Sequence, residues 1–174
     1  MLLLHCHVAR FATQLGAQGF NGVEKIMGDA VTTLIIDDSA DSRKWLRQRL
    51  ESVGCVVVGE AESPVGGLER FEALRPRLVT LDIVMPEIDG MTAIELLRRI
   101  KRRDHEVAVL VVSGRPTATA HDFLKLGAIG YLEKPFIDFA DAARLLRAYF
   151  PELGIKAAVV GKRGGLSARL ADKA

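Results

Sequence analysis

Short apolar runs alternate with longer amphipathic stretches along the chain from Thr32 onward. Several of the apolar runs have almost no internal polar position and are rich in β-branched residues, which is typical of strands buried on both faces. We expect strands at residues 31–37, 55–61, 78–82, 107–113 and 129–133. Because such strands need a helical layer on each face, the alternation predicts a parallel sheet covered by helices.

The amphipathic stretches that follow the strands predict five helices. We expect them at residues 41–53, 64–74, 92–102, 118–126 and 139–149. Ser63 followed by Pro64 is typical of a helix start, since serine caps free N–H groups and proline fits the first helical turn. Gly54 and Gly127 stand where two of these helices should end. The five pairs favour an α/β fold, a flavodoxin-like doubly wound five-stranded parallel sheet with strand order 2-1-3-4-5 and helices on both faces.

Composition agrees with one folded domain. The chain has 174 residues, of which 49% are hydrophobic and 26% charged, and this disfavours disordered, collagen-like and coiled-coil classes. The apolar run at 107–112 is far shorter than the roughly 20 residues that cross a bilayer, so we expect no membrane span. The first residues carry no secretory signal pattern, and two cysteines make no disulfide framework, so we expect a cytoplasmic protein.

Both ends of the chain differ from its middle. Residues 1–29 hold no clear strand and are expected to be an N-terminal extension, with Met27 as an alternative translation start. Residues 30–150 are expected to form the folded domain, and residues 151–174 a short basic tail with no output domain. The net charge of +2 lacks the strong basic bias of nucleic-acid-binding domains, which makes nucleic acid an unlikely partner.

Acidic residues close two strands that the predicted order makes neighbours. Asp37 and Asp38 end the first strand, and Asp82 ends the third. Ligands of open parallel sheets collect at the carboxyl ends of strands, so we expect these carboxylates to converge. Three anions that close require a cation, and their hard oxygens suit Mg²⁺ rather than zinc. The alternative is that Asp37 and Asp38 only cap the following helix.

Polar motifs also follow the third, fourth and fifth strands, whereas the second strand ends without one. The string DIVMPEIDG begins at Asp82, Ser113 precedes a glycine at the end of the fourth strand, and Lys134 precedes a proline at the end of the fifth. In this order and spacing the motifs resemble the receiver domain of response regulators from two-component signalling, over about residues 32–149. A complete ordered set is far more specific than one short motif.

The resemblance implies a role for each matched residue. Asp82 resembles the phosphoacceptor, which attacks a phosphohistidine on a histidine kinase or histidine phosphotransfer protein and forms an acyl phosphate. Asp37, Asp38, Asp82 and the backbone carbonyl of Val84 resemble the Mg²⁺ ligands. Lys134 would offset charge on the phosphoryl oxygens, so that catalysis is mostly positioning and electrostatics.

The resemblance also implies a conformational switch. The hydroxyl of Ser113 would move to the new phosphoryl group, and the ring of Tyr131 would turn inward into the vacated space. The resemblance further implies a cis peptide between Lys134 and Pro135. A downstream protein target would read the switch on the face formed by the fourth helix, fifth strand and fifth helix. These are expected at residues 118–126, 129–133 and 139–149.

The sequence therefore predicts a stand-alone receiver, a phosphoacceptor switch rather than an enzyme. One alternative is a Mg²⁺-dependent aspartyl-phosphate phosphohydrolase, but that chemistry needs a second acid two residues after the nucleophile, where Val84 or Ser39 stands. The other alternative is a phosphorylation-independent interaction module, which the complete motif set disfavours. We also expect slow loss of phosphate, because neither Val84 nor Arg115 orients an attacking water well.

Overall fold

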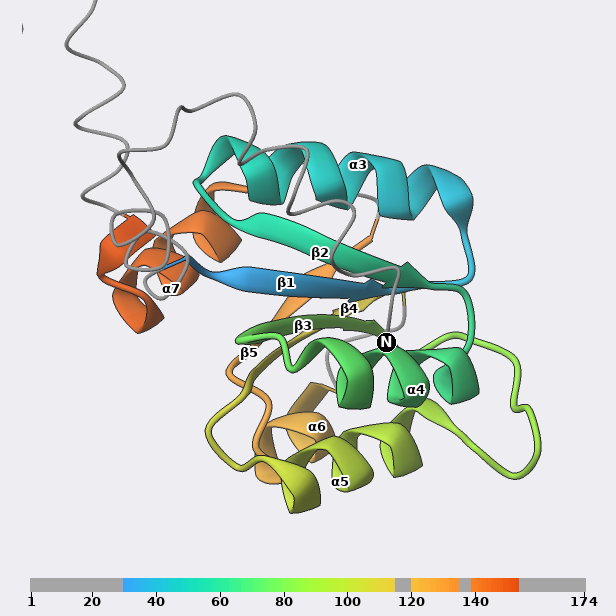
Figure 1. Cartoon of the computed structure of the whole chain (residues 1–174). Helices are drawn as coiled ribbons and strands as arrows, with labels where there is room; N and C mark the ends of the chain where they lie inside the picture. The colour runs from blue at the N-terminus through green and yellow to red at the C-terminus, as the bar shows by residue number, and fades with distance from the viewer. Residues whose placement is uncertain (1–29, 115–119, 135–138, 154–174) are drawn as a thin grey trace, which may run out of the picture. The chain divides into compact units, whose positions relative to one another are not determined.

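The computed structural model describes residues 30–114, 120–134 and 139–153, where a sheet lies between two layers of helices (Figure 1). The strands are β1 Thr32–Ile36, β2 Val56–Ala61, β3 Leu78–Asp82, β4 Ala108–Ser113 and β5 Gly130–Glu133. The helices are α3 Ala40–Ser52, α4 Pro64–Leu74, α5 Ala93–Arg103, α6 Ala120–Lys125 and α7 Ala140–Tyr149. All ten predicted elements are present, with bounds within two residues of those expected.

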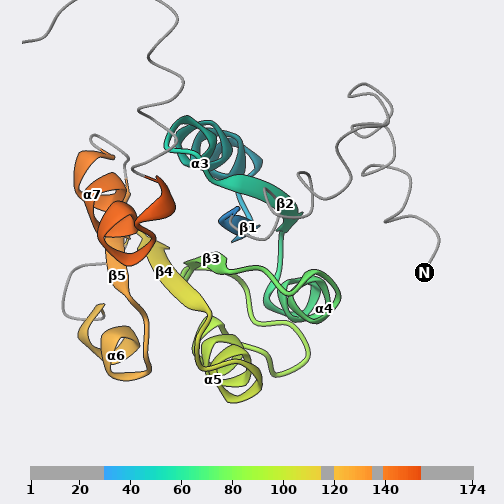
Figure 2. The same ribbon diagram turned by 60° about the vertical axis from the view of Figure 1, so that its left-hand side comes forward.

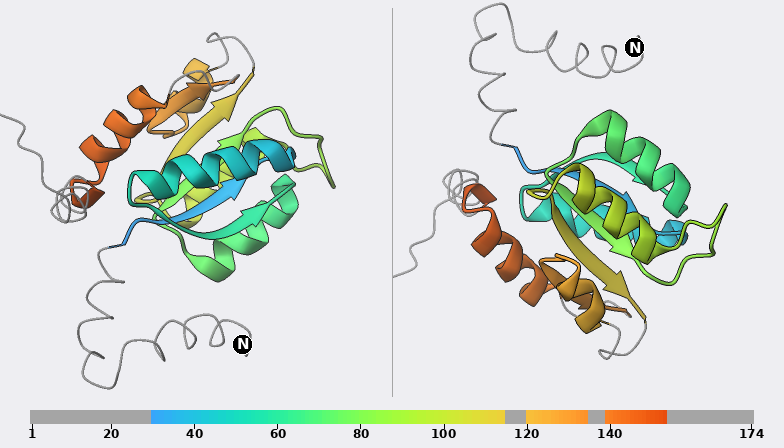
Figure 3. Two further views of the ribbon diagram at one scale, coloured as in Figure 1. Left: turned by 90° about the horizontal axis from the view of Figure 1, so that it is seen from above. Right: turned by 90° about the horizontal axis from the view of Figure 1, so that it is seen from below.

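The sheet is parallel throughout, and its strand order is β2-β1-β3-β4-β5, which confirms the predicted topology. Residue Ile36 of β1 pairs with Leu81 of β3, so the residues that follow β1 lie level with the end of β3. Figure 3 shows the segment at 83–92, between β3 and α5, extending beyond the carboxyl ends of these strands. This edge of the sheet is where the predicted acidic residues stand.

Apolar side chains fill both sides of the sheet. Figure 2 shows α3 and α7 on one face and α4, α5 and α6 on the other. Leu46, Leu50 and Leu146 are fully buried in the core under α3 and α7, whereas Phe71 and Phe123 are buried in the opposite core. Every residue of β3 and β4 is buried, because each face of these central strands meets a helix layer.

Capping residues and glycines mark the starts and ends of helices at the positions that the sequence predicted. Ser63 caps α4, and its hydroxyl accepts a hydrogen bond from the Gly66 N–H at 3.2 Å. Gly54 and Gly127 have φ angles of 99° and 94°, which glycine adopts without the strain of a side chain. None of the helices in the described ranges has the length and apolar content that a membrane span requires. The predicted extension and residues 154–174 of the predicted tail lie outside the described residues.

Candidate functional site

The three predicted acidic residues converge at the carboxyl ends of β1 and β3. Asp37, Asp38 and Asp82 each offer a carboxylate oxygen, and these oxygens lie within 4.8 Å of one another. Asp37 is fully buried and Asp82 is only 3% exposed, whereas Asp38 is exposed. The neighbouring positions of β1 and β3 bring the acids together, as the strand order predicted.

Lys134 lies against the two buried acids. Its Nζ is 2.7 Å from Asp37 Oδ2 and 2.6 Å from Asp82 Oδ2. Its backbone N–H donates to the Ser113 carbonyl at 2.9 Å, which ties the end of β5 to the end of β4. Burial alone would lower the pKa of Lys134, but its bonds and charge attraction to the two carboxylates together raise that pKa above the usual lysine range. Lys134 is therefore an ammonium ion at neutral pH.

The acids nevertheless outnumber this ammonium. Burial, helped by the nearby charge of Asp82, raises the pKa of Asp37 above its usual value despite the lowering by Lys134 and by the Ser39 N–H. An acid whose charged form is disfavoured in this way gains from a further cation. The donor set consists of carboxylate oxygens with one exposed member open to water, which fits Mg²⁺, a metal that keeps several water ligands. The residues present therefore fit a magnesium site.

Short loops orient the two buried carboxylates. Asp37 Oδ1 accepts from the Ser39 N–H at 2.9 Å, and Asp82 Oδ1 accepts from the Val84 N–H at 2.8 Å. The helix cap of α3 is Ser39, whose hydroxyl accepts from the Ser42 N–H. Ser39, and neither Asp37 nor Asp38, therefore occupies the cap position of α3. The carbonyl of Val84 as a metal ligand stays a prediction.

The predicted switch residues lie in contact. Ser113 is fully buried at the end of β4, and the Tyr131 hydroxyl donates to its backbone carbonyl at 3.2 Å. Burial, ahead of its charged neighbours, raises the pKa of Tyr131, which keeps this hydroxyl a donor. The contact involves the carbonyl of Ser113, whereas the predicted switch involves its hydroxyl, so the switch itself stays a prediction. Pro135, with the predicted cis peptide, and Arg115 lie outside the described residues.

Two residues at this site were not predicted from the sequence. Arg43 of α3 donates through Nη1 to the carbonyls of Asp37 and Asp38, at 2.7 and 3.2 Å. Its Nε lies 3.3 Å from Glu60 Oε2 on β2. The sequence feature that could have indicated this pair is Glu60, a lone acid in an otherwise apolar strand, together with Arg43 in the helix that follows the acid pair. Periodicity places both residues but does not show that they meet.

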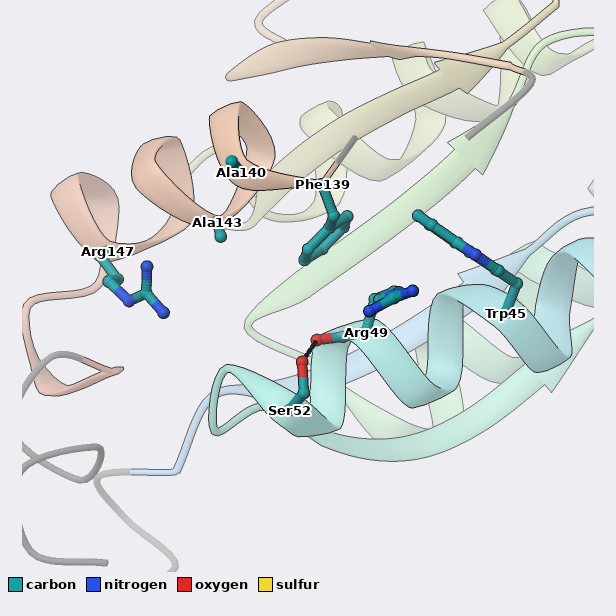
Figure 4. Close-up of a pocket in the computed structure, with 7 residues that line it drawn as sticks. All are labelled: Trp45, Arg49, Ser52, Phe139, Ala140, Ala143 and Arg147. Atoms are coloured by element: carbon teal, nitrogen blue, oxygen red, sulfur yellow. Dashed lines mark hydrogen bonds between the residues drawn. The ribbon is translucent and has the colours of Figure 1, made fainter. Parts of the chain in front are cut away.

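A separate cavity of about 370 Å³ lies between α3 and α7 (Figure 4). Trp45 meets Phe139 edge to face at 5.7 Å between ring centroids, and the Arg49 guanidinium lies 5.2 Å from the centre of the Trp45 ring. The lining is completed by Ser52, Ala140, Ala143 and Arg147. This cavity shares no lining residue with the acid cluster, so it is not part of the site described above.

Comparison with known proteins gives matches in sequence and in fold. A family model described as the response regulator receiver domain matches residues 33–148. A protein-glutamate methylesterase/protein-glutamine glutaminase 2 of Xanthomonas oryzae pv. oryzae is 36% identical over 133 residues, which cover 76% of this chain and 36% of that protein. The corresponding protein of Koribacter versatilis is 40% identical over 60% of this chain and 29% of its own length. The chain thus spans about a third of the length of these curated relatives.

Solved structures share the fold. A chain of the crystal structure of the CheX-CheY-BeF3-Mg+2 complex from Borrelia burgdorferi matches with a TM-score of 0.60 and 29% identity, over 68% of this chain and 88% of that one. A response regulator receiver domain protein (CheY-like) from Methanospirillum hungatei matches with a TM-score of 0.61 over 73% of this chain and 98% of that one. Its identity is 24%, so this second likeness bears on the fold alone.

Proposed function

Since this chain belongs to the response regulator receiver domain family, we propose that it accepts a phosphoryl group on Asp82 and signals by phosphorylation-dependent protein contacts. The donor is a histidine kinase or a histidine phosphotransfer protein. The observation that carries the proposal is that Asp82 contacts Lys134 and lies beside the acid pair. A single carboxylate at a strand end would not support it.

The chemistry follows from the contacts of Asp82. One of its carboxylate oxygens attacks the phosphorus of the donor phosphohistidine, an O–P bond forms, and the N–P bond breaks with its electron pair returning to the imidazole. The Val84 N–H, 2.8 Å from Oδ1, holds the carboxylate in orientation. Lys134, which lies 2.6 Å from Oδ2, would donate to a phosphoryl oxygen once Asp82 is phosphorylated.

Mg²⁺ bound by Asp37, Asp38, Asp82 and the Val84 carbonyl would supply a second positive charge to the phosphoryl oxygens. The fully buried Asp37 keeps one oxygen on the Ser39 N–H and the other on Lys134. Lys134 is thus held by a second carboxylate besides Asp82, so that the ammonium stays in place when Asp82 changes its charge.

Phosphorylation would change the conformation of Ser113 and Tyr131. Ser113 lies at the end of β4, beside the strand that carries Asp82, and its hydroxyl would bond the new group. Movement at Ser113 would disturb the hydrogen bond that Tyr131 makes to its carbonyl, and the ring would shift. The downstream protein would then bind the face formed by α6, β5 and α7.

Labelling with acetyl phosphate and Mg²⁺ tests the proposal. Intact-mass measurement should show one phosphoryl group on the wild type. The control variant Glu87→Ala, which removes an exposed acid from the loop that follows Asp82, should also carry one. Asp82→Ala should carry none, and excess EDTA should abolish the label on the wild type. Equal labelling of Asp82→Ala and wild type would contradict the assignment of Asp82.

The same material separates the alternatives. A phosphohydrolase would turn over phosphomonoesters many times, whereas the proposed switch holds one phosphoryl group for each chain. An interaction module that works without phosphorylation would bind its target equally before and after labelling. The activities named for the curated relatives are not part of the proposal, because the chain spans about a third of their length. A cytoplasmic location, action as a stand-alone receiver and slow phosphate loss stay predictions.

A further inference from the structure

Arg43 joins the backbone of the acid pair to the neighbouring strand. Its guanidinium donates to the carbonyls of Asp37 and Asp38, at 2.7 and 3.2 Å, and pairs with Glu60 through Nε at 3.3 Å. Figure 1 shows α3, which carries Arg43, running alongside β2, which carries Glu60. Because a guanidinium is planar and rigid, three acceptors around it fix its position and tilt. Its side chain is 16% exposed, so water competes little for the bond to the Asp37 carbonyl, whereas the bond to the Asp38 carbonyl is exposed.

The two carbonyls belong to the peptide planes on either side of the Asp38 α-carbon. Holding both planes therefore fixes the backbone of Asp38 and the direction in which its side chain leaves. Asp37 and Asp82 each bond a loop N–H and Lys134 through their carboxylates. The exposed carboxylate of Asp38 makes no such bond within the described ranges, so its aim depends on its backbone.

We infer that Arg43, oriented by Glu60, is a positioning residue that holds Asp38 ready to bind the divalent cation. The inference rests on the proposed function, since the cation is the Mg²⁺ of phosphoryl transfer. Partners that orient metal ligands from behind contribute about 10- to 100-fold to metal affinity. Arg43 should lie at the lower end of that range, because it acts on one ligand through the backbone.

Arg47 provides a matched control. It lies one turn further along α3, and its Nε pairs with the other carboxylate oxygen of Glu60 at 2.6 Å. It also pairs with Glu51, but in the part of the chain that the structure describes it makes no bond to the carbonyls of the acid pair. Arg47→Gln therefore removes the same charge from the same helix and from the same glutamate, and it leaves the hold on Asp38 intact.

Calorimetric titration with MgCl₂ tests the inference on wild type, Arg43→Gln, Arg43→Lys and Arg47→Gln. Urea unfolding in EDTA first establishes that each variant is folded. We expect Arg43→Gln to bind Mg²⁺ about 10-fold more weakly than wild type, and Arg47→Gln to bind as wild type does. Arg43→Lys should lie between them, because one ammonium can bond a carbonyl but cannot reach all three acceptors.

Labelling with acetyl phosphate gives a second readout. For Arg43→Gln the Mg²⁺ concentration at half-maximal rate should rise, whereas the rate at saturating Mg²⁺ should match the wild type. If Arg43 had a purely structural role, the variant would be less stable, but its Mg²⁺ concentration at half-maximal rate would not rise. Equal Mg²⁺ affinities of Arg43→Gln and Arg47→Gln would overturn the inference and leave the proposed function standing. A wild type that neither binds Mg²⁺ nor becomes labelled would overturn the proposed function itself.

Discussion

Replacing Lys134 by methionine should lower the free energy of unfolding, because two buried carboxylates lose the cation that they share. The substitution keeps most of the side-chain stem and removes the charge that lies 2.7 and 2.6 Å from two carboxylates. Those carboxylates are 0% and 4% exposed, so water replaces the lost cation poorly. Removing one partner of a buried ion pair costs about 3–5 kcal/mol. Because the Lys134 side chain is itself 19% exposed, we expect about 3 kcal/mol at pH 8.

The cost should depend on pH in a defined direction. Burial already raises the pKa of Asp37, and the loss of Lys134 removes the main opposing influence, so this pKa rises further in the variant. The folded variant then binds protons more tightly than its unfolded chain, and its stability falls as pH rises above the usual aspartate range. In the wild type the pKa of Lys134 is raised, so the contribution of Lys134 to the free energy of unfolding is fully present at any pH below the usual lysine pKa of 10.5. The deficit of the variant should therefore be smaller at pH 5 than at pH 8.

Urea unfolding followed by circular dichroism, in EDTA at pH 5 and pH 8, measures this deficit. The exposed Lys125 on α6 supplies the control, and Lys125→Met should change the free energy of unfolding little at either pH. A deficit below about 1 kcal/mol for Lys134→Met at pH 8 would refute the reasoning, because such values are typical of exposed ion pairs. An equal deficit at both pH values would show that the buried acids do not take up protons.

Three further predictions concern the core and its edges. Thr80→Val should raise the free energy of unfolding by about 1 kcal/mol in urea, since the buried Thr80 hydroxyl has no hydrogen-bond partner within the described ranges; a destabilised variant would show that this hydroxyl is satisfied. Burial raises the pKa of the Cys55 thiol to about 11, so in a Cys6→Ala protein a thiol reagent at pH 8 should react slowly until urea is added, and fast labelling of the folded protein would contradict this. Gly67→Ala should cost roughly 1–3 kcal/mol, because a Cβ there meets an isoleucine side chain of β1 at 2.8 Å. Gly66→Ala, where the nearest atom is a serine hydroxyl at 3.3 Å, should cost less, and the opposite ranking by urea unfolding would be evidence against this packing.

Local patterns predicted much of the fold. Runs such as Ala108–Ser113, buried at every position, are strands whose two faces both meet helices, and this condition can be recognised from the residues alone. Ser63 and Gly54 mark helix ends because capping and a positive φ depend on the residue type at one position. Once the strands are parallel and ordered, Asp37 and Asp82 must meet at one edge.

Contacts between distant side chains depended on the tertiary structure. The meeting of Arg43 with Glu60, the hydrogen bond from Tyr131 to the Ser113 carbonyl, and the cavity between α3 and α7 were not predicted. The sequence by itself determined which positions are buried and which strand ends are acidic, since burial and chain direction follow from residue type and periodicity. The register between elements and the directions of long side chains are set only when the helices pack on the sheet, because they depend on the shapes of all the neighbours at once.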